Sequence, residues 1–98
     1  MSAYEIINNE RDQRFEYHEG NALAFLEYRF YKNSIALMHT EVPDSIEGKG
    51  VAAALAEYAF RYAAENNKPV MVYCPYVSVY LKRHPELRVQ LDKEFHHE

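Results

Sequence analysis

A short glycine-containing segment at residues 47–52 is the part of the sequence best suited to chemistry. It reads Glu-Gly-Lys-Gly-Val-Ala and directly precedes an alanine-rich stretch with helical periodicity. The first amide groups of a helix have no acceptor within the helix, and the helix dipole adds partial positive charge there. Glycines also let an anion approach the backbone closely. The segment therefore predicts an anion site, and a simple turn into the helix is the alternative. It is not a P-loop, because no Gly-Lys-Ser/Thr follows.

Cys74 is the single cysteine of the chain and a candidate nucleophile. It ends a short apolar run, and Pro75 after it can begin a helix. A helix N-terminus lowers the pKa of a neighbouring thiol, and the thiolate is a strong nucleophile. A free cysteine is also among the most buried residue types. Two interpretations stay open: a catalytic nucleophile, or a small buried residue that closes a strand.

His39 and Glu41 are candidate general bases. They lie two residues apart in a predicted strand, so they share one face of it. Either side chain can remove the proton that an ammonium group must lose before it attacks a carbonyl carbon. A strand histidine with a structural hydrogen bond is the alternative. The five histidines are too scattered for a metal site, so we expect no metal.

Alternating apolar and polar residues predict β-structure from the N-terminus to residue 42. The sequence favours strands at residues 4–7, 14–18, 22–31 and 34–42. A two-residue hairpin turn at Lys32-Asn33 joins the last two. In the last strand, one face is expected to carry Ile35, Leu37, His39 and Glu41, and the opposite face Ala36, Met38, Thr40 and Val42.

Helical periodicity replaces the alternation after Pro43. Residues 50–67 carry the apolar stripe of a core-facing helix, which consists of Val51, Ala54, Leu55, Tyr58, Ala59 and Tyr62. Residues 70–73 predict a short strand, central in the sheet and covered on both faces. A second helix is expected to begin at Pro75 and to end before Pro85. Residues 86–95 favour another short helix.

These elements predict an α/β (α+β) fold: a mixed, mostly antiparallel five-stranded sheet with one long helix and short C-terminal helices. The strand–helix–strand unit at residues 34–73 implies a parallel pair of strands. Ligands in such sheets bind beyond the carboxyl ends of the parallel strands. Val42 and Cys74 stand at those ends, so we expect the two segments to meet at one mouth.

Length and charge restrict the classes of function. The chain has 98 residues, which fits a single domain over residues 1–98 with one modest core. Its formal net charge of −4 argues against nucleic-acid partners and anionic membranes, because both require a basic footprint. The sequence has no signal-peptide pattern and no apolar run of membrane-spanning length. We expect a cytoplasmic protein that is a monomer or a weak dimer.

Four blocks of sequence resemble the small single-domain branch of the acetyl-CoA-dependent N-acetyltransferase (GNAT) superfamily. That branch carries a His-Thr-x-Val-Pro strand end, a Gly-x-Gly-x-Ala loop, a Cys-Pro/Ser-Tyr/Phe-Val segment, and then a Tyr and a His-Pro or Asn-Pro. The corresponding residues here are 39–43, 48–52, 74–77, and Tyr80 with His84-Pro85. The blocks occur in the right order over about half of the chain.

The resemblance implies acetyl-CoA as co-substrate and gives roles to individual residues. The pyrophosphate would lie on the backbone amides of Gly48, Lys49, Gly50, Val51 and Ala52. The thioester would lie between the diverging strand ends, where the Val42 amide can stabilise an oxyanion. A cysteine at the position of Cys74 is a proposed catalytic residue of the branch. Tyr80 matches a tyrosine near the coenzyme sulfur, often a general acid, and a core aromatic is its alternative.

Two departures from the superfamily pattern keep other functions open. Glu47 stands where Arg or Gln is preferred, so phosphate contacts would depend on backbone groups and Lys49. The usual final β-hairpin, which often shapes the acceptor site, is missing from the expected elements. A minimal N-acetyltransferase is therefore the first interpretation, and a CoA-binding module with little or no transferase activity is the alternative. A protein-interaction domain, in which residues 48–52 are only a turn, is the third.

The acceptor is expected to be cationic. Glu41, Asp44 and Glu47 surround the expected mouth, and an acidic rim attracts positively charged groups. This charge pattern favours a small amine or a lysine-bearing peptide.

Overall fold

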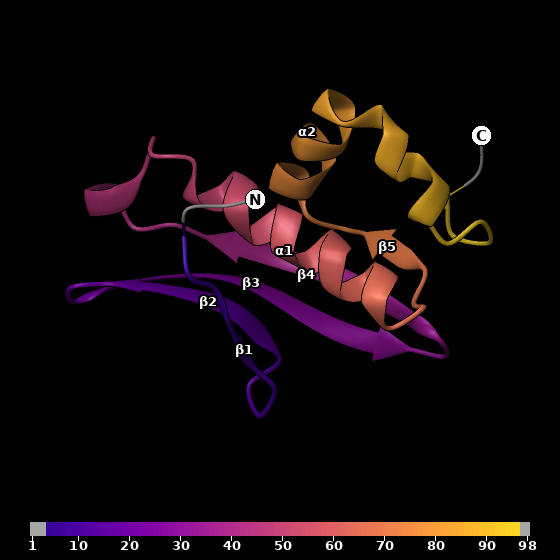
Figure 1. The fold of residues 1–98 in the computed structure, drawn as a ribbon, viewed down its shortest axis with the longest axis horizontal. Helices are drawn as coiled ribbons and strands as arrows, with labels where there is room; N and C mark the ends of the chain where they lie inside the picture. Colours follow the sequence, from indigo (N-terminus) through magenta and orange to yellow (C-terminus); the bar gives the residue numbers. More distant parts are fainter. Residues whose placement is uncertain (1–3, 97–98) are drawn as a thin grey trace.

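The computed structural model describes residues 4–96 and shows two layers, a five-stranded sheet and the helices that cover one of its faces (Figure 1). The strands are β1 (Ile7–Asn9), β2 (Arg14–Glu19), β3 (Ala22–Tyr31), β4 (Ser34–Glu41) and β5 (Val70–Val72). The helices are α1 (Val51–Glu65) and α2 (Pro75–Arg83), with 3₁₀ helices η1 (Asp44–Ile46) and η2 (Pro85–Gln90).

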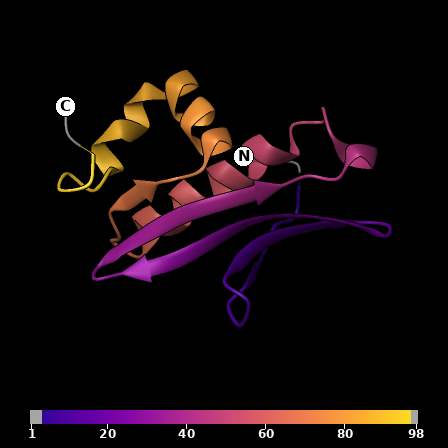
Figure 2. The same cartoon turned by 180° about the vertical axis from the view of Figure 1, so that it is seen from behind.

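The strands lie in the order β1-β2-β3-β4-β5, so each strand pairs with its neighbour in sequence. The first four are antiparallel, and β4 and β5 are parallel. This confirms the predicted α/β fold with a mixed, mostly antiparallel sheet. Seen from behind, the strands lie in front of α1 (Figure 2). We call the face under α1 the inner face and the opposite face the outer face.

Helix α1 holds the core together because it packs in two directions. Leu55 and Ala59 are fully buried over the inner face, in contact with β2, β3 and β4. Phe60 is also buried and lies parallel to Tyr80 of α2, with ring centroids 6.3 Å apart. The predicted stripe is confirmed on the sheet side, but it omitted Phe60, which packs toward α2. The helix ends as predicted at two asparagines, where Asn67 adopts a positive φ of 55°.

A register shift in β4 places the residues after Met38 on the opposite face of the sheet from the one predicted. Glu27 of β3 pairs with His39, but Tyr28 pairs with Leu37, so Met38 is left without a partner as a β-bulge. Ile35 and Leu37 are buried on the inner face before the bulge. After it, His39 and Glu41 point to the outer face, and Thr40 and Val42 to the inner face. The prediction that Ile35, Leu37, His39 and Glu41 share one face is therefore wrong.

Strand β1 lies further along the chain than predicted. It covers Ile7–Asn9 rather than residues 4–7, although both asparagines have a low preference for strands. Their side chains are satisfied by tertiary hydrogen bonds: Tyr28 donates to Asn8 Oδ1 at 2.7 Å, and Asn9 Nδ2 donates to Glu16 at 2.9 Å. Hydrogen bonds that the local sequence does not reveal thus overrule strand propensity here.

The C-terminal segment differs from the predicted helix over residues 86–95. Only Pro85–Gln90 is helical, and it is a 3₁₀ helix. Leu91 then forms a parallel bridge with Val70, and the Asp92 amide donates to the Val70 carbonyl at 2.8 Å. Val72 donates its amide to Nε2 of His96 at 2.9 Å. The segment stops being helical after Gln90 because its backbone hydrogen-bonds to the free edge of β5. Strand β5 is therefore an edge strand, and the prediction that it is central in the sheet is wrong.

A carboxylate is buried on the outer face between β1 and β3. Glu16 is 5% exposed, and its oxygens accept from Arg14 at 2.7 Å and Asn9 at 2.9 Å and lie 3.1 Å from His18 Nε2. Burial alone would raise the pKa of Glu16, but the hydrogen bonds from Asn9, His18 and Arg14 outweigh it and lower this pKa.

In the described part of the chain, no helix is both long and apolar enough to cross a membrane.

Glu16→Gln should destabilise the fold by about 1–3 kcal/mol at neutral pH, because it removes charge-assisted hydrogen bonds in a buried place. A carboxylate whose folded pKa is lowered stabilises the protein above its usual value of 4.5, and this is lost as the pH falls through the folded pKa. Urea unfolding between pH 3 and pH 7 should therefore give a shallower pH dependence for the variant. Glu65→Gln, at an exposed position of α1, is the control. If the free energy of unfolding changed with pH equally in Glu16→Gln and in the wild type, the lowered pKa of Glu16 would be contradicted.

Candidate functional site

The candidate site begins where β4 and β5 separate. The two strands pair over only three residues each, and the Tyr73 amide makes the last hydrogen bond, to the Leu37 carbonyl at 3.0 Å. Beyond this point β4 continues to Glu41, whereas the segment that follows β5 turns into α2 at Pro75. We call the opening between these diverging ends the split. It lies at the carboxyl ends of the two parallel strands, where such sheets place their ligands.

The loop before α1 has the backbone geometry of an anion site. Gly48 and Gly50 have φ values of 84° and 85°, which only glycine adopts without strain. Gly50 is the N-cap of α1, and its carbonyl accepts from Ala54 at 3.0 Å. The amides that precede Ala54 in the helix have no acceptor within it. Among residues 4–96, and apart from the chain neighbours of each glycine, no heavy atom lies within 4 Å of the place where a β-carbon would stand on Gly48 or Gly50. An anion can therefore come close to this backbone.

Two adjoining cavities run along the first turn of α1. The smaller, of about 190 Å³, is lined by Val42, Glu47, Gly48, Gly50, Val51, Ala52, Ala53 and Tyr76. The larger, of about 320 Å³, is lined by Tyr4, Lys49, Gly50, Ala53, Ala54, Glu57, Tyr80 and His84. They share Gly50 and Ala53, and α2 contributes one tyrosine to each. We call the two together the α1–α2 groove. It contains every residue predicted to bind the cofactor: Val42, Gly48, Lys49, Gly50, Val51, Ala52 and Tyr80.

Side chains from the segment before β1 and from β2 hold the loop in place. The Tyr4 hydroxyl donates to the Lys49 carbonyl, and the Lys49 ammonium group lies 3.1 Å from a Glu19 oxygen. Hydrogen bonds from Tyr17, at 2.8 Å, and from Lys49 lower the pKa of Glu19. Lys49 is thus already paired with a carboxylate. Glu47 is exposed, so its carboxylate can stay in water while the backbone amides face an anion.

Cys74 lies at the inner side of the split. It is 1% exposed and occupies the N-cap position of α2. Its Sγ lies 3.1 Å from Oγ1 of Thr40, and either group can donate the hydrogen bond. The structure thus combines features of both interpretations of this cysteine: the thiol is buried, as in the core, and it stands at a helix N-terminus, as a reactive thiol requires.

His39 and Glu41 form a pair on the outer face. His39 Nε2 and Glu41 Oε1 are 2.8 Å apart, and both side chains are exposed. Because of the bulge, they lie on the opposite face of β4 from Thr40 and Cys74. The structure therefore does not bring the predicted catalytic residues into one cluster. Among residues 4–96, no group of three or more histidine, cysteine, aspartate or glutamate side chains could hold a metal ion.

Tyr80 lies in the larger cavity of the groove with a perturbed ionisation. Burial raises its pKa, and the nearby carboxylates of Glu57 and Glu86 raise it further. The hydroxyl is therefore protonated over a wide pH range and can donate a proton or a hydrogen bond. Its ring also packs against His84, with centroids 4.3 Å apart.

Several residues in the groove or at the split were not singled out from the sequence. Tyr76 lies one helical turn before Tyr80, and its 53% exposure shows that it lines the groove rather than the core. Thr40 was visible only as part of the motif at residues 39–43, because its contact with Cys74 depends on the bulge. Tyr4 reaches Lys49 over 45 residues of chain, and no local signal could have revealed that contact.

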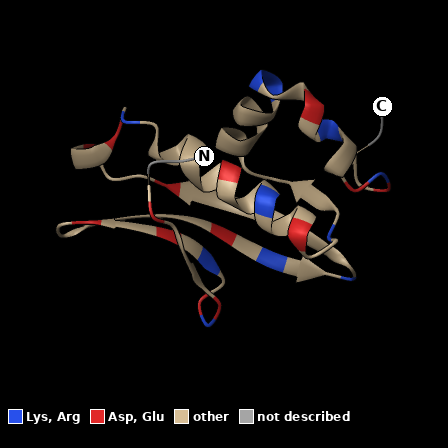
Figure 3. Cartoon of the chain, in the orientation of Figure 1, with Lys and Arg blue, Asp and Glu red and all other residues tan. Residues whose placement is uncertain are grey.

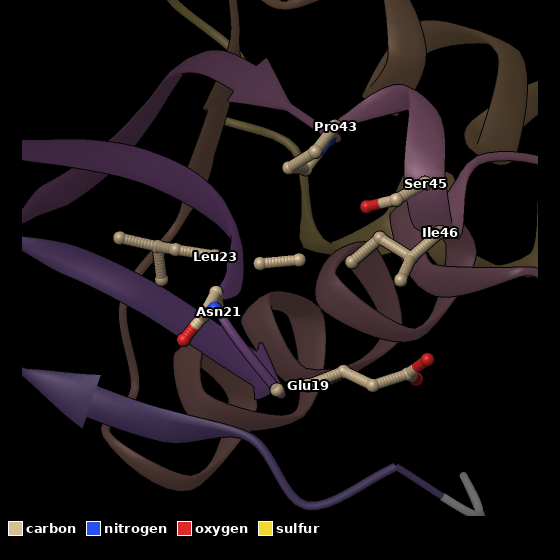
Figure 4. A pocket seen from close by; sticks show the side chains of 8 residues that line it. Glu19, Asn21, Leu23, Pro43, Ser45 and Ile46 are labelled. Carbon is tan, nitrogen blue, oxygen red and sulfur yellow. The ribbon is translucent and has the colours of Figure 1, made fainter.

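Other cavities of the described residues lie outside the groove. One of about 550 Å³ lies between the β2–β3 turn and η1, lined by Glu19, Leu23, Pro43 and Ile46 among others (Figure 4). A larger one of about 690 Å³ includes Lys32, Lys68 and Lys93. It adjoins the C-terminal end of α1, where the helix dipole disfavours anions. The loop before α1 is therefore the better anion site, although its cavities are smaller.

Charge is mixed over the molecule. Figure 3 shows acidic and basic residues interspersed along the strands and α1, so no single sign of charge dominates the described sheet. Glu41, Asp44 and Glu47 are exposed between the end of β4 and the loop, as expected for an acidic rim.

Comparison with known proteins agrees with this geometry. The sequence profile of the GCN5-related N-acetyl-transferase family matches residues 14–90. A GCN5-like protein from Staphylococcus aureus, solved by NMR, superposes over 100% of both chains with a TM-score of 0.68 and 32% identity. Protein NATD1 from Xenopus tropicalis is 37% identical over 54 residues, which are 55% of this chain and 50% of NATD1. Human NATD1 shows the same identity over 48% of its length. The chain thus spans about half the length of these curated relatives.

The buried state of Cys74 predicts slow reaction with thiol reagents. Native protein should react with a disulfide reagent such as DTNB about tenfold or more slowly than protein unfolded in urea, since the reagent must wait for an opening of the structure. Thr40→Ala should speed the native reaction, because it removes side-chain atoms that cover the thiol at 3.1 Å and so eases access to it. Tyr31→Phe, on the exposed end of β3, should leave it unchanged. A native rate equal to the unfolded rate would contradict the burial.

Proposed function

Because the chain belongs to the GCN5-related N-acetyltransferase family, we propose that it binds acetyl-CoA at the loop before α1 and transfers the acetyl group to an amine. The observation that carries this proposal is the loop itself. Two glycines with positive φ, a helix N-terminus and open space on both glycines meet at the entrance of the α1–α2 groove.

The pyrophosphate of the coenzyme fits the amides from Gly48 to Ala52. Backbone N–H groups at a helix N-terminus bind phosphate without a basic side chain, which matters here because Lys49 is paired with Glu19. The small side chains of Ala52 and Ala53 leave room for the rest of the coenzyme along the groove. The thioester then reaches the split, where the Val42 amide is the proposed donor to the developing oxyanion.

Direct transfer is the route that we propose first. The ammonium group of the acceptor loses a proton to the His39–Glu41 pair on the outer face. The neutral nitrogen then forms a bond with the acetyl carbonyl carbon and gives up its second proton to water, and the carbon–sulfur bond breaks as the CoA thiolate leaves. Tyr80 supplies a proton to that thiolate, a role supported by its place in the groove, and the phenolate then regains a proton from water.

A second route uses Cys74 as a relay, and its position at the N-cap of α2 favours it. The Cys74 thiol loses a proton, its thiolate attacks the thioester carbon, and the CoA thiolate leaves and takes up that proton. The neutral amine then attacks acetyl-Cys74 and forms the amide, and the Cys74 thiolate leaves and takes up the proton that the nitrogen loses. The burial of Sγ requires the α2 N-terminus to move before CoA can reach it. A CoA-binding module without turnover is the alternative function. It is favoured because residues 91–96 occupy the edge of β5, and the described residues form no final hairpin of the kind that often shapes the acceptor site in the superfamily.

Gly50→Val tests the cofactor site. A β-branched residue at φ 85° is strained and places its side chain where the anion would approach, so the affinity for acetyl-CoA should fall by about tenfold or more, or about 1.4 kcal/mol. Isothermal titration calorimetry measures this affinity. Gly20→Val is the matched control, since Gly20 also has a positive φ of 59° and open space but lies in the β2–β3 turn. No binding to the wild type, or equal losses in both variants, would refute the site.

Mass spectrometry separates the two routes. Incubation with acetyl-CoA in the absence of an acceptor should leave Cys74 unmodified on the direct route and should add one acetyl group to it on the relay route. Cys74→Ser should then retain most of the turnover on the direct route. Acetyl-Cys74 that forms and decays at the rate of turnover would overturn the direct route and establish the relay.

A further inference from the structure

We propose that a pocket on the outer face, at the base of the split, holds the acceptor, and that this acceptor is a primary amine with an apolar body. The proposal rests on the proposed function and names its substrate class. The pocket has a volume of about 430 Å³. Its floor is formed by Ala36, Met38 and Met71, and its walls include Tyr73 and Phe95. We call it the outer pocket.

The outer pocket is an apolar surface that α1 and α2 do not cover. Tyr73 is 50% exposed and Phe95 37% exposed, and their ring centroids lie 4.7 Å apart. Exposed aromatic side chains that face one another over an apolar floor are typical of small-molecule sites, and the volume falls within the usual range of such sites.

The wall that Phe95 forms is held in place by the C-terminal segment. Its amide donates to Oδ1 of Asp92 at 3.1 Å, and the Ser34 hydroxyl donates to the same carboxylate. His96, the next residue, accepts the Val72 amide at 2.9 Å. The edge of β5 and the outer pocket are thus built by one segment, so this segment takes the place in which a final hairpin would stand.

The position of the outer pocket links it to the split. Met38 is the bulged residue of β4, and Tyr73 makes the last hydrogen bond between β4 and β5. The pocket therefore opens where the two strands begin to diverge, but on the opposite face of the sheet from the α1–α2 groove. A donor in the groove and an acceptor in this pocket can approach the split from opposite faces without competing for space.

The charged side chains beside the outer pocket indicate that the acceptor carries an ammonium group. Beyond Met38, Glu41 and His39 lie on the same outer face, and Glu41 can pair with an ammonium group. A strand rises about 3.3 Å per residue, so Glu41 lies about 10 Å along β4 from Met38. An amine of that length can place its nitrogen at the carboxylate and its apolar body in the pocket.

Polyamines and amino acids fit this arrangement less well. A second ammonium group would have to leave water for an apolar pocket, which is costly. A free carboxylate would need a cation, but Arg29 at the rim is held by Glu27 at 3.2 Å and by the Tyr28 carbonyl at 2.7 Å. The geometry thus selects one positive charge at one end and an apolar group, such as a phenyl ring, at the other.

Acetylation of 4-phenylbutylamine and of 1,6-diaminohexane, two amines of similar extended length, by the full chain tests the proposal. We expect kcat/KM to be about tenfold or more higher for 4-phenylbutylamine, and Tyr73→Gln to reduce that value by about tenfold, mainly through KM. The affinity for acetyl-CoA should not change, because Tyr73 lies outside the groove. Val79→Gln is the matched control, since Val79 is also 50% exposed but lies on α2. A preference for the diamine, or no effect of Tyr73→Gln, would overturn the proposal.

Binding can also be followed without turnover. Titration of methyl-labelled protein with 4-phenylbutylamine should shift the methyl signals of Met38 and Met71. Acetyl-CoA binding combined with unshifted Met38 and Met71 signals would overturn the acceptor pocket and leave the proposed function standing. Shifted methyl signals in a protein that binds no acetyl-CoA would refute the proposed function alone. Shifts that depend on protein concentration without amine would identify a second copy as the occupant and overturn the proposal.

Discussion

The unpaired Met38 in β4 determines where every candidate functional group lies. Up to this residue, β4 pairs regularly with β3 and with the short β5. The bulge then reverses the alternation, so Thr40 and Val42 turn inward while His39 and Glu41 turn outward. Because β5 stops pairing at the same level, the bulge and the split form one feature, with a groove on the inner side and a pocket on the outer side. Acyl transfer needs two ligands to meet, and this arrangement supplies two approaches to one opening.

The rest of the fold keeps this opening stable in a small protein. α1 packs on the sheet with one side and on α2 with the other, so its N-terminus and the start of α2 are fixed relative to each other. Tyr4 and Glu19 hold Lys49 in the loop, and residues 91–96 complete the free edge of β5. These contacts come from segments far apart in the sequence. They fix the loop before α1 and the edge of β5 in a chain of 98 residues.

The sequence predicted whatever depends on periodicity and on local backbone chemistry. Four features could be predicted because each pattern is confined to a few neighbouring residues: the alternation of β3, the apolar stripe of α1, the helix start at Pro75 and the glycine loop. The bulge at Met38 could not be predicted, since nothing in residues 34–42 interrupts their alternation and only pairing with β3 reveals it. The asparagines of β1 and the path of residues 91–96 were predicted wrongly for the same reason. Tertiary hydrogen bonds to Glu16, Tyr28, Val70 and Val72 decide both.

The proposed function depends on the backbone amides before α1, which would bind the coenzyme. A ¹H–¹⁵N correlation spectrum recorded during titration with CoA follows each of these amides separately. We expect the largest changes at Gly48, Lys49, Gly50, Val51 and Ala52, with Tyr76 next. The amides near Lys68, beside the cavity of about 690 Å³, should stay unchanged. A spectrum in which the five loop amides do not move, or in which the residues around Lys68 move most, would mean that the coenzyme does not bind at this loop.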